Sequence, residues 1–510
     1  MRPLLLCRYG VHLSKEEAAE LVAPHPDTLA LVHSWLAHYG VQSSSISTTH
    51  GGNWLTLTGV PVFRANELLG ASYQLYRHAG TNDTAILRTV GYALPTVLHT
   101  HVQTVAPTTF FSSTRVPHQT SQKLSVREVE ALAKAAPRGP MTAHSRREIP
   151  DIVTPDFLRW LYKTFSYVPR APNRNAIGIV GYRYEFPREG ALRTFMNLFR
   201  RDAQNTNFHI QPVDGGGVEI GPSLEANLEM EYAQAVTYPT RHIYFGTSRD
   251  RYIWTPETHL PAAGDLFLTW MGFLLGGSVP IPQTIITTYG AYERNVPPEY
   301  AWHVCNLFAL LGARGVSVLS PTGDDGVGNG DCINYSGYAQ FIAKFPATCM
   351  CDVYILSTSF LPHRYGFAGP WVTSVGGTTS ALPEVTANLS GGGFSDYFAR
   401  PNYQDVAVPP YFDFLGDRHQ GLYKFVSAAT WPDQFLLIFT VLVAAESPTS
   451  LRKRSTSCSS FSPICLFTRA AQTAQLRCVF PYPSLHSRPP IPEHAADSRC
   501  TDRSRHNLVA

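Results

Sequence analysis

Residues 315 to 330 read Gly-Val-Ser-Val-Leu-Ser-Pro-Thr-Gly-Asp-Asp-Gly-Val-Gly-Asn-Gly, an apolar run followed by a glycine-rich turn. The apolar half predicts a buried strand, which Pro321 brings to an end. Asp324 then lies just past the strand, and ligands of open α/β sheets usually bind at the carboxyl ends of strands. The turn is therefore either part of a binding site or a loop in which Asp324 and Asp325 cap only their own backbone.

Strand and helix patterns alternate ahead of this turn. We predict strands at residues 176–182, 208–213, 283–288 and around Ile243, and helices at residues 188–201, 223–236, 266–276 and 297–311. Parallel strands need a long crossover connection, which is usually a helix. The alternation therefore predicts an α/β fold, with a parallel sheet that carries helices on both faces.

Two acids lie one turn apart in the predicted helix 223–236, which reads Ser-Leu-Glu-Ala-Asn-Leu-Glu-Met-Glu-Tyr-Ala-Gln-Ala-Val. Like charges at the spacing of Glu225 and Glu229 destabilise a helix by about 0.2–0.5 kcal/mol. The pair has either a shared chemical role or an ordinary solvated face. Two glycine motifs follow it, Val-Thr-Ser-Val-Gly-Gly-Thr-Thr at 372–379, which predicts a strand and a turn, and Gly-Gly-Gly-Phe-Ser at 391–395.

Taken in order, these motifs resemble the sedolisin family of serine-carboxyl peptidases, and they are most similar to fungal tripeptidyl peptidases. The resemblance rests on Glu-Ala-Asn-Leu-Glu at 225–229, on Gly-Val-Ser-Val-Leu and Gly-Asp-Asp-Gly-Val-Gly within 315–328, and on the two glycine motifs. It covers roughly residues 8 to 433. It implies a subtilisin-like parallel sheet with helices on both faces, preceded by an α+β prodomain.

The resemblance implies a role for each acid. Glu225 would be the general base that takes a proton from a serine nucleophile, Glu229 would orient it, and Asp324 would donate a hydrogen bond to the oxyanion. A carboxylate base stays partly ionised below about pH 6, so the resemblance implies activity in acid. The family usually has Asp in place of Glu229, and the extra methylene moves the carboxyl by about 1.5 Å and weakens a catalytic hydrogen bond.

The nucleophile motif departs further from the family, whose pattern is Gly-Thr-Ser-(Ala or Cys)-Ser at the start of a helix. The nearest string is Ser-Thr-Ser-Cys-Ser at 455–459, which makes Ser457 the candidate nucleophile. Ser455 replaces the glycine that lets the turn approach substrate, and the residues that follow are poor helix formers. A chance match in a serine-rich tail is the alternative, and we expect the chain as written not to hydrolyse peptides.

Four parts follow one another along the chain. Residues 1–111 resemble the activation domain of the family, residues 112–150 read as an exposed linker, residues 151–460 resemble an incomplete catalytic domain, and residues 461–510 read as an aberrant or disordered tail. Residues 350–369 interrupt motifs that are nearly contiguous in the family. They are either a surface loop or a retained intron.

The first part mixes helices and strands. We predict a helix after Ser14, whose capping-box partner is Glu17, and a second helix at 26–39. We predict strands at 54–58, 60–63, 73–77, 89–97 and 102–107. Thr154 and Pro155 form an N-cap and N1 pair that opens a helix at 156–165.

The composition, with 44% apolar and 15% charged residues, is that of a soluble globular protein. Residues 451–510 hold nine Lys or Arg against three Asp or Glu, so the net charge of +3 leaves −3 on residues 1–450. A slightly acidic body offers no basic face to nucleic acid. The apolar run 435–445 is about half the length of a membrane span.

Calcium is the cofactor that the resemblance implies, bound by acids that follow the nucleophile. Past residue 450 only Glu493, Asp497 and Asp502 remain, and their spacing matches no known set of ligands. The nine cysteines contain no Cys-x-x-Cys pair, so a zinc site is not expected, and their pairing stays open.

Three Asn-x-Ser/Thr sequons begin at Asn82, Asn334 and Asn388 and fit a secretory route. The start, Met-Arg-Pro-Leu-Leu-Leu-Cys, is shorter than the roughly 7–15 apolar residues of a signal peptide. We therefore expect an extracellular protein whose start is truncated and whose signal peptide is missing from this chain.

The first hypothesis is a secreted, acid-acting tripeptidyl peptidase zymogen that releases tripeptides from free N-termini of polypeptides and is inhibited by its own prodomain. A second is a non-catalytic relative that binds peptide or inhibits a related protease. A third is a chain that cannot fold, because lost elements would expose apolar surface and open sheet edges.

Overall fold

The structure is a computed structural model, and its centre is a parallel sheet of six strands. It describes residues 10–49, 51–76, 86–111, 126–135, 153–182, 186–213, 216, 224–247, 266–277, 279–327, 340–349, 371–378, 385–398, 404, 406–418 and 422. The insert 350–369, Ser457 and the tail 461–510 lie outside the described residues, so the predictions made for them stay predictions.

The sheet runs in the order β12-β10-β8-β5-β7-β6, and every neighbouring pair is parallel. Its strands are β5 (Ala176–Gly181), β6 (Phe208–Val213), β7 (Arg241–Thr247), β8 (Thr284–Thr287), β10 (Ser317–Pro321) and β12 (Val372–Val375). Each lies where the sequence predicts a strand. The strand before the Asp324 turn is therefore an inner strand, paired on both sides.

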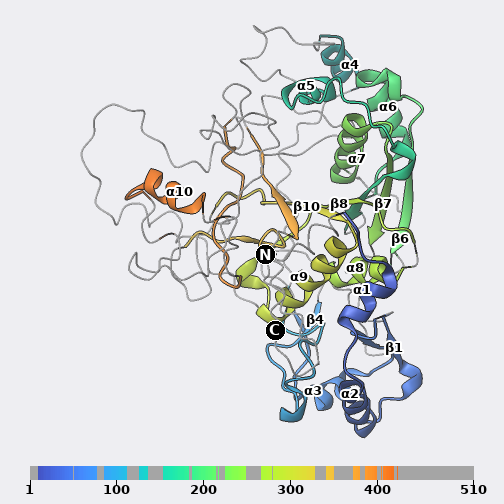
Figure 1. The fold of residues 1–510 in the computed structure, drawn as a ribbon, viewed down its shortest axis with the longest axis vertical. Coiled ribbons are helices and arrows are strands. Elements are labelled where there is room, and N and C mark those ends of the chain that lie inside the picture. Colours follow the sequence, from blue (N-terminus) through green and yellow to red (C-terminus); the bar gives the residue numbers. More distant parts are fainter. Residues whose placement is uncertain are drawn as a thin grey trace.

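Alternating side chains give the sheet two apolar faces, each covered by helices (Figure 1). Ile179 and Tyr244 join a cluster with α6 (Glu189–Phe199) and α7 (Leu224–Thr237). The next residues along the same strands, Val180 and Phe245, join a larger cluster with α8 (Leu266–Gly276) and α9 (Pro298–Ala313). The short helix α5 (Pro155–Leu161) packs on α7, with Thr154 as its N-cap as predicted. The α/β fold with helices on both faces is confirmed.

The N-terminal part forms a smaller α+β unit at one end of the molecule (Figure 1). It contains α1 (Lys15–Val22), α2 (Pro26–His38), α3 (Val62–Leu69) and two antiparallel pairs, β1 (Ile46–Thr48) with β2 (Leu55–Leu57) and β3 (Gln74–Tyr76) with β4 (Ile86–Arg88). The capping box of Ser14 and Glu17 is present. The unit has its own core, which includes Leu36 and Leu98.

Three predicted strands of this unit are wrong. Residues 60–63 do not form a strand, because Val62 begins α3, whose buried residues are Leu68 and Leu69. Residues 89–97 and 102–107 lie beyond β4 and form no strand, because backbone N–H groups here bond to separate segments, such as Thr108 and the end of α3, rather than to one neighbouring strand. The bond from Ala93 N to Leu69 O is an example.

Short elements complete the described part. They are α4 (Val126–Ala135), the antiparallel pair β9 (Ala291–Tyr292) and β11 (Lys344–Phe345), and α10 (Val408–Leu415). The helix α4 lies within residues 112–150, which the sequence reads as an exposed linker. The disulfide Cys305–Cys349, which the sequence left open, ties α9 to the segment after β11. Among the described helices, none combines the length and apolar character of a membrane span.

Candidate active site

Glu225 lies in the first turn of α7 and is half-buried. The Tyr289 hydroxyl donates a hydrogen bond of 2.8 Å to Glu225 Oε2. Tyr289 lies two residues past the end of β8, so this bond places the Glu225 carboxyl near the carboxyl end of a central strand. This is the edge of an α/β sheet at which ligands usually bind.

Tyr289 is itself held in place by aromatic packing. Its ring is 8% exposed and meets the Tyr182 ring edge-on, with 4.9 Å between the centroids. The Tyr182 hydroxyl bonds to Thr287 Oγ1 at 2.8 Å. The packed ring holds the Tyr289 hydroxyl in place. Because Tyr182 bonds to Thr287 of β8, the sheet fixes the position from which this hydroxyl reaches Glu225.

Glu229 follows Glu225 by one turn on the same side of α7 and is half-buried. The buried side of this helix carries polar groups that the sequence analysis missed. Asn227 accepts a bond from Arg188 N at 2.8 Å, Gln234 donates to Asn207 O at 2.7 Å, and Glu231 is fully buried. These contacts tie α7 to its neighbours and fix the turn on which the two predicted acids stand.

Asp324 lies in the turn after β10, as predicted, and β10 pairs with β8. The residue is exposed, but the surrounding protein desolvates its carboxyl and raises its pKa, with a further rise from Asp325 and an opposing effect of the Lys344 ammonium. Asp325 accepts a short hydrogen bond from the Tyr292 hydroxyl. It therefore has a partner outside its own turn, unlike an acid that caps only its own backbone.

The Gly391-Gly-Gly-Phe-Ser395 motif packs against this turn. A Cβ atom on Gly391 would lie 2.0 Å from Thr322 O, so only glycine fits there. Thr322 precedes Asp324 in the chain, and Gly326 follows it. Gly326 N donates to Leu389 O at 2.9 Å, so both flanks of Asp324 contact the segment around the motif. Two regions that the sequence marked separately thus form one structure around Asp324.

A buried carboxyl supports the same region. Glu293, two residues after the start of β9, is 2% exposed. It accepts hydrogen bonds from Ser395 Oγ and from Asp396 N, each at 2.6 Å. Burial raises the pKa of Glu293 to about 7, although both hydrogen bonds act in the opposite direction. The sequence analysis missed Glu293. The only indication of it in the sequence was the motif 391–395, because Ser395 at its end is a hydrogen-bond partner of Glu293.

Glu225, through Tyr289, and Asp324 lie at the carboxyl ends of two neighbouring strands, β8 and β10. Glu225 and Glu229 stand on α7 and Asp324 follows β10, with Tyr289 at the end of the strand beside β10. Ser457 lies outside the described residues. Within the described residues no three His, Cys, Asp or Glu side chains form a group that could hold a metal ion.

Comparisons with known proteins extend these observations. Residues 7–111 match the family described as Pro-kumamolisin, activation domain. The chain is 31% identical over 428 residues to the probable tripeptidyl-peptidase SED3 of Arthroderma benhamiae, an alignment that covers 82% of this chain and 65% of the relative. It is 30% identical over 429 residues to the tripeptidyl-peptidase SED2 of Arthroderma otae, covering 82% of this chain and 66% of the relative.

The chain thus spans slightly less than two thirds of the length of these relatives. Among solved structures, it is similar to Pseudomonas sedolisin (serine-carboxyl proteinase) complexed with pseudo-iodotyrostatin. The similarity has a TM-score of 0.33 at 18% identity and covers 50% of this chain and 66% of the other.

Proposed function

We propose that the chain is a peptidase of the sedolisin family and that its site is that of an acid-acting serine-carboxyl peptidase. Its similarity to fungal tripeptidyl-peptidases and its match to the activation domain support this. The substrates would be polypeptides with free N-termini, from which tripeptides are released. The observation that carries the proposal is the hydrogen bond from Tyr289 to Glu225, which holds a half-buried carboxyl beside the strand end that carries Asp324.

In this proposal Glu225 is the general base. It removes the proton of a serine hydroxyl as the oxygen attacks the amide carbonyl, and it returns that proton to the leaving amine. The Tyr289 hydroxyl donates to the carboxylate and keeps one of its oxygens engaged, so that the other can face the nucleophile. Glu229 orients Glu225 from the next turn, at a position where the family usually has Asp.

Asp324 stabilises the oxyanion in its neutral form, by donating a hydrogen bond to the negatively charged oxygen. The raised pKa of Asp324 extends this neutral form to less acidic solutions, and Lys344 limits that extension. Activity should therefore decline as the pH rises through the pKa of Asp324. This direction, with activity falling as the pH rises, agrees with a peptidase that works in acid.

Ser457 is the proposed nucleophile. Ser455 stands where the family has glycine, and poor helix formers follow the motif, so we propose that turnover by this chain is slow or absent. We also propose an extracellular location. A buried disulfide between Cys305 and Cys349 supports it, because such bonds persist mainly in oxidising compartments. The sequon at Asn388 supports it as well, since that residue is exposed.

The proposal is tested with the full chain and a tripeptide-aminoacyl reporter at about pH 4, where a carboxylate base still works. Hydrolysis that is lost in both Ser457→Ala and Glu225→Gln would support the complete mechanism. Peptide binding without hydrolysis, weakened by Asp324→Asn, would support an intact groove with a defective nucleophile. A folded chain that neither binds nor cleaves peptide contradicts the proposal.

A further inference from the structure

The side chain of Lys344 lies beside the candidate site. Lys344 begins β11 and pairs with Tyr292 of β9 in the antiparallel register. Its ammonium lies 5.6 Å from the centroid of the Tyr292 ring. Desolvation raises the pKa of Asp324 and the charge of Lys344 opposes that rise, so the ammonium lies close enough to act on the turn after β10. The cation and the proposed oxyanion acid therefore belong to one region.

Two glycines enclose the stem of Lys344. A Cβ atom on Gly290 would lie 3.1 Å from Lys344 Cε, and a Cβ atom on Gly323 would lie 2.8 Å from Lys344 Cδ and 3.1 Å from its Nζ. Gly290 follows Tyr289, and Gly323 precedes Asp324. The lysine stem thus passes between the segments that carry the hydroxyl and the acid of the site, and close contacts on both sides hold it there.

The donors of this ammonium are not used within the part of the chain that the structure describes. There the half-buried Lys344 makes no ion pair and no hydrogen bond. Asp325, the second acid of the turn, is engaged by the Tyr292 hydroxyl. Because its pKa is raised, Asp324 stays neutral to a higher pH than an ordinary Asp, and in acid it gives the ammonium no counter-charge. A partly desolvated ammonium gains free energy when an anion pairs with it.

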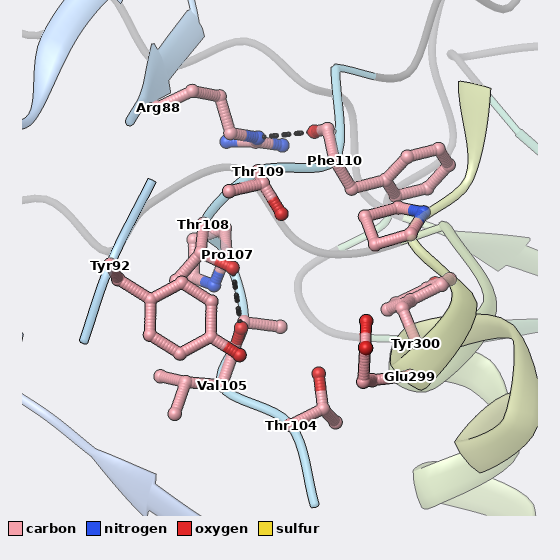
Figure 2. Close-up of a pocket in the computed structure, with 12 residues that line it drawn as sticks. Arg88, Tyr92, Thr104, Val105, Pro107, Thr108, Thr109, Phe110, Glu299 and Tyr300 are labelled. Carbon is pink, nitrogen blue, oxygen red and sulfur yellow. Dashed lines mark hydrogen bonds between the residues drawn. The ribbon is translucent and has the colours of Figure 1, made fainter. Parts of the chain in front are cut away.

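Arg88 shows how a structural cation differs (Figure 2). It is 5% exposed and lines a pocket between the N-terminal unit and α9, where Phe110 and Tyr300 face each other. Its guanidinium donates to Phe110 O at 2.7 Å and to Leu87 O at 2.9 Å. Arg88 is therefore held by backbone carbonyls of its own unit, whereas Lys344 has no such acceptor among the described residues.

We propose that Lys344 determines substrate specificity by binding a carboxylate that lies next to the scissile bond of the peptide. Acidic peptides are then the preferred substrate class. The proposal rests on the proposed function, because it takes Asp324 as the residue at the scissile carbonyl. The carboxylate has two sources: an Asp or Glu side chain at the third or fourth position of the peptide, or the C-terminus of a tetrapeptide.

The first experiment measures binding of labelled peptides to the full chain at about pH 5, where a Glu side chain is mostly ionised. The peptides have a free N-terminus and an amidated C-terminus, and they carry Glu or Gln at the third or fourth position. The wild type should bind a Glu peptide about tenfold more tightly than its Gln counterpart, as for a partly solvated hydrogen bond between charged groups. A tetrapeptide with a free or amidated C-terminus tests the second source.

Lys344→Met keeps an unbranched stem between the two glycines and removes the charge, so the ratio of affinities should fall to about one. Lys134→Met is the matched control, because Lys134 is exposed on α4, and it should leave the ratio near tenfold. Equal affinity of the wild type for both members of every pair, or a preference that survives Lys344→Met, overturns the proposal. In either case binding of the neutral peptides still supports the peptidase site.

A second measurement decides the role of Lys344 if no peptide binds, an outcome that contradicts the proposed function instead. Thermal unfolding of the full chain is followed at the same pH with N-acetylglutamate α-amide, whose only carboxylate is in the side chain, and with N-acetylglutamine amide as the neutral probe. A rise in Tm with the first probe alone, lost in Lys344→Met, supports the carboxylate site. No rise, or an equal rise in the variant, overturns it. If Lys344→Met does not fold, Lys344→Gln gives the same tests with the same outcomes.

Discussion

The carboxyl of Glu293 is buried against Ser395 and Asp396, and its pKa of about 7 lies well above the ordinary 4.5. Folding therefore requires this group to hold a proton at pH values where the unfolded chain has lost it. The free energy of unfolding is therefore highest below about pH 4.5, where Glu293 is protonated in both states. It falls as the pH rises from there to about 7. The total change is roughly 3 kcal/mol.

Glu293→Gln should remove this dependence, because the amide imitates the protonated acid at every pH. We expect the wild type to lose free energy of unfolding between pH 4.5 and 7.5, and the variant to show a flatter profile. Urea unfolding at a series of pH values measures it. Glu189→Gln, which removes a charge from an exposed position, should leave the slope intact; a slope that survives Glu293→Gln contradicts the assignment.

Tyr289→Phe tests the hydroxyl that orients Glu225. In any preparation that cleaves the reporter, we expect kcat to fall about tenfold to a hundredfold, the effect of losing a hydrogen bond to a charged group. Tyr182→Phe is the control, since the Tyr182 hydroxyl bonds Thr287 rather than a carboxylate. Equal losses in both variants would show that the tyrosines matter through packing alone.

At the scale of elements, the turn after β10 depends on a close approach between Gly391 and Thr322. Gly391→Ala would place a methyl group 2.0 Å from Thr322 O, so either the 391–395 motif or the Asp324 turn must move. We expect a loss of about 1–3 kcal/mol in the free energy of unfolding, typical of forced overpacking, together with weaker peptide binding. Thermal unfolding and binding at acid pH measure the two effects.

The neighbouring position provides the control for this change. A Cβ atom on Gly392 would meet Val327 Cγ1 at 3.5 Å, an ordinary contact. Gly392→Ala should therefore be tolerated. A Gly391→Ala protein as stable as Gly392→Ala would mean that the two regions are not packed as described.

Elements with a regular pattern were predictable from the sequence. The strands β5, β6 and β8 and the helices α7, α8 and α9 lie within two residues of their predicted bounds, because each has an apolar pattern of one period. Three strand predictions failed in the N-terminal unit, at residues 60–63, 89–97 and 102–107, where short segments carry too little pattern. In that unit the positions of the backbone hydrogen-bond partners decided whether a segment became a strand. Ala93, which bonds to Leu69 at the end of α3, is an example.

At the scale of the whole molecule, the N-terminal unit is anchored by one aromatic side chain above others. Phe110 is 5% exposed and joins the core cluster of the sheet-bearing body through Tyr300. Phe110→Ala should release the unit even at pH 7, because truncating a buried Phe costs about 3–5 kcal/mol. Hydrogen exchange of residues 104–111 reports the release.

Phe63→Ala is the matched control, in the same unit but 61% exposed. It should leave the docking unchanged at neutral pH. If Phe110→Ala retains full protection over residues 104–111, the aromatic contact with α9 is not what holds the unit in place.

The sequence by itself determined the parallel sheet, the order of its helices, the resemblance to a peptidase family and the positions of Glu225, Glu229 and Asp324, because these depend on local periodicity and on short motifs. Tertiary structure alone decided the partners: Tyr289 for Glu225, Ser395 for Glu293, Cys349 for Cys305 and Trp54 for His303. Each of these pairs joins residues more than 40 positions apart. Burial and contact between such residues arise only when the sheet brings distant segments together, and no local pattern records them.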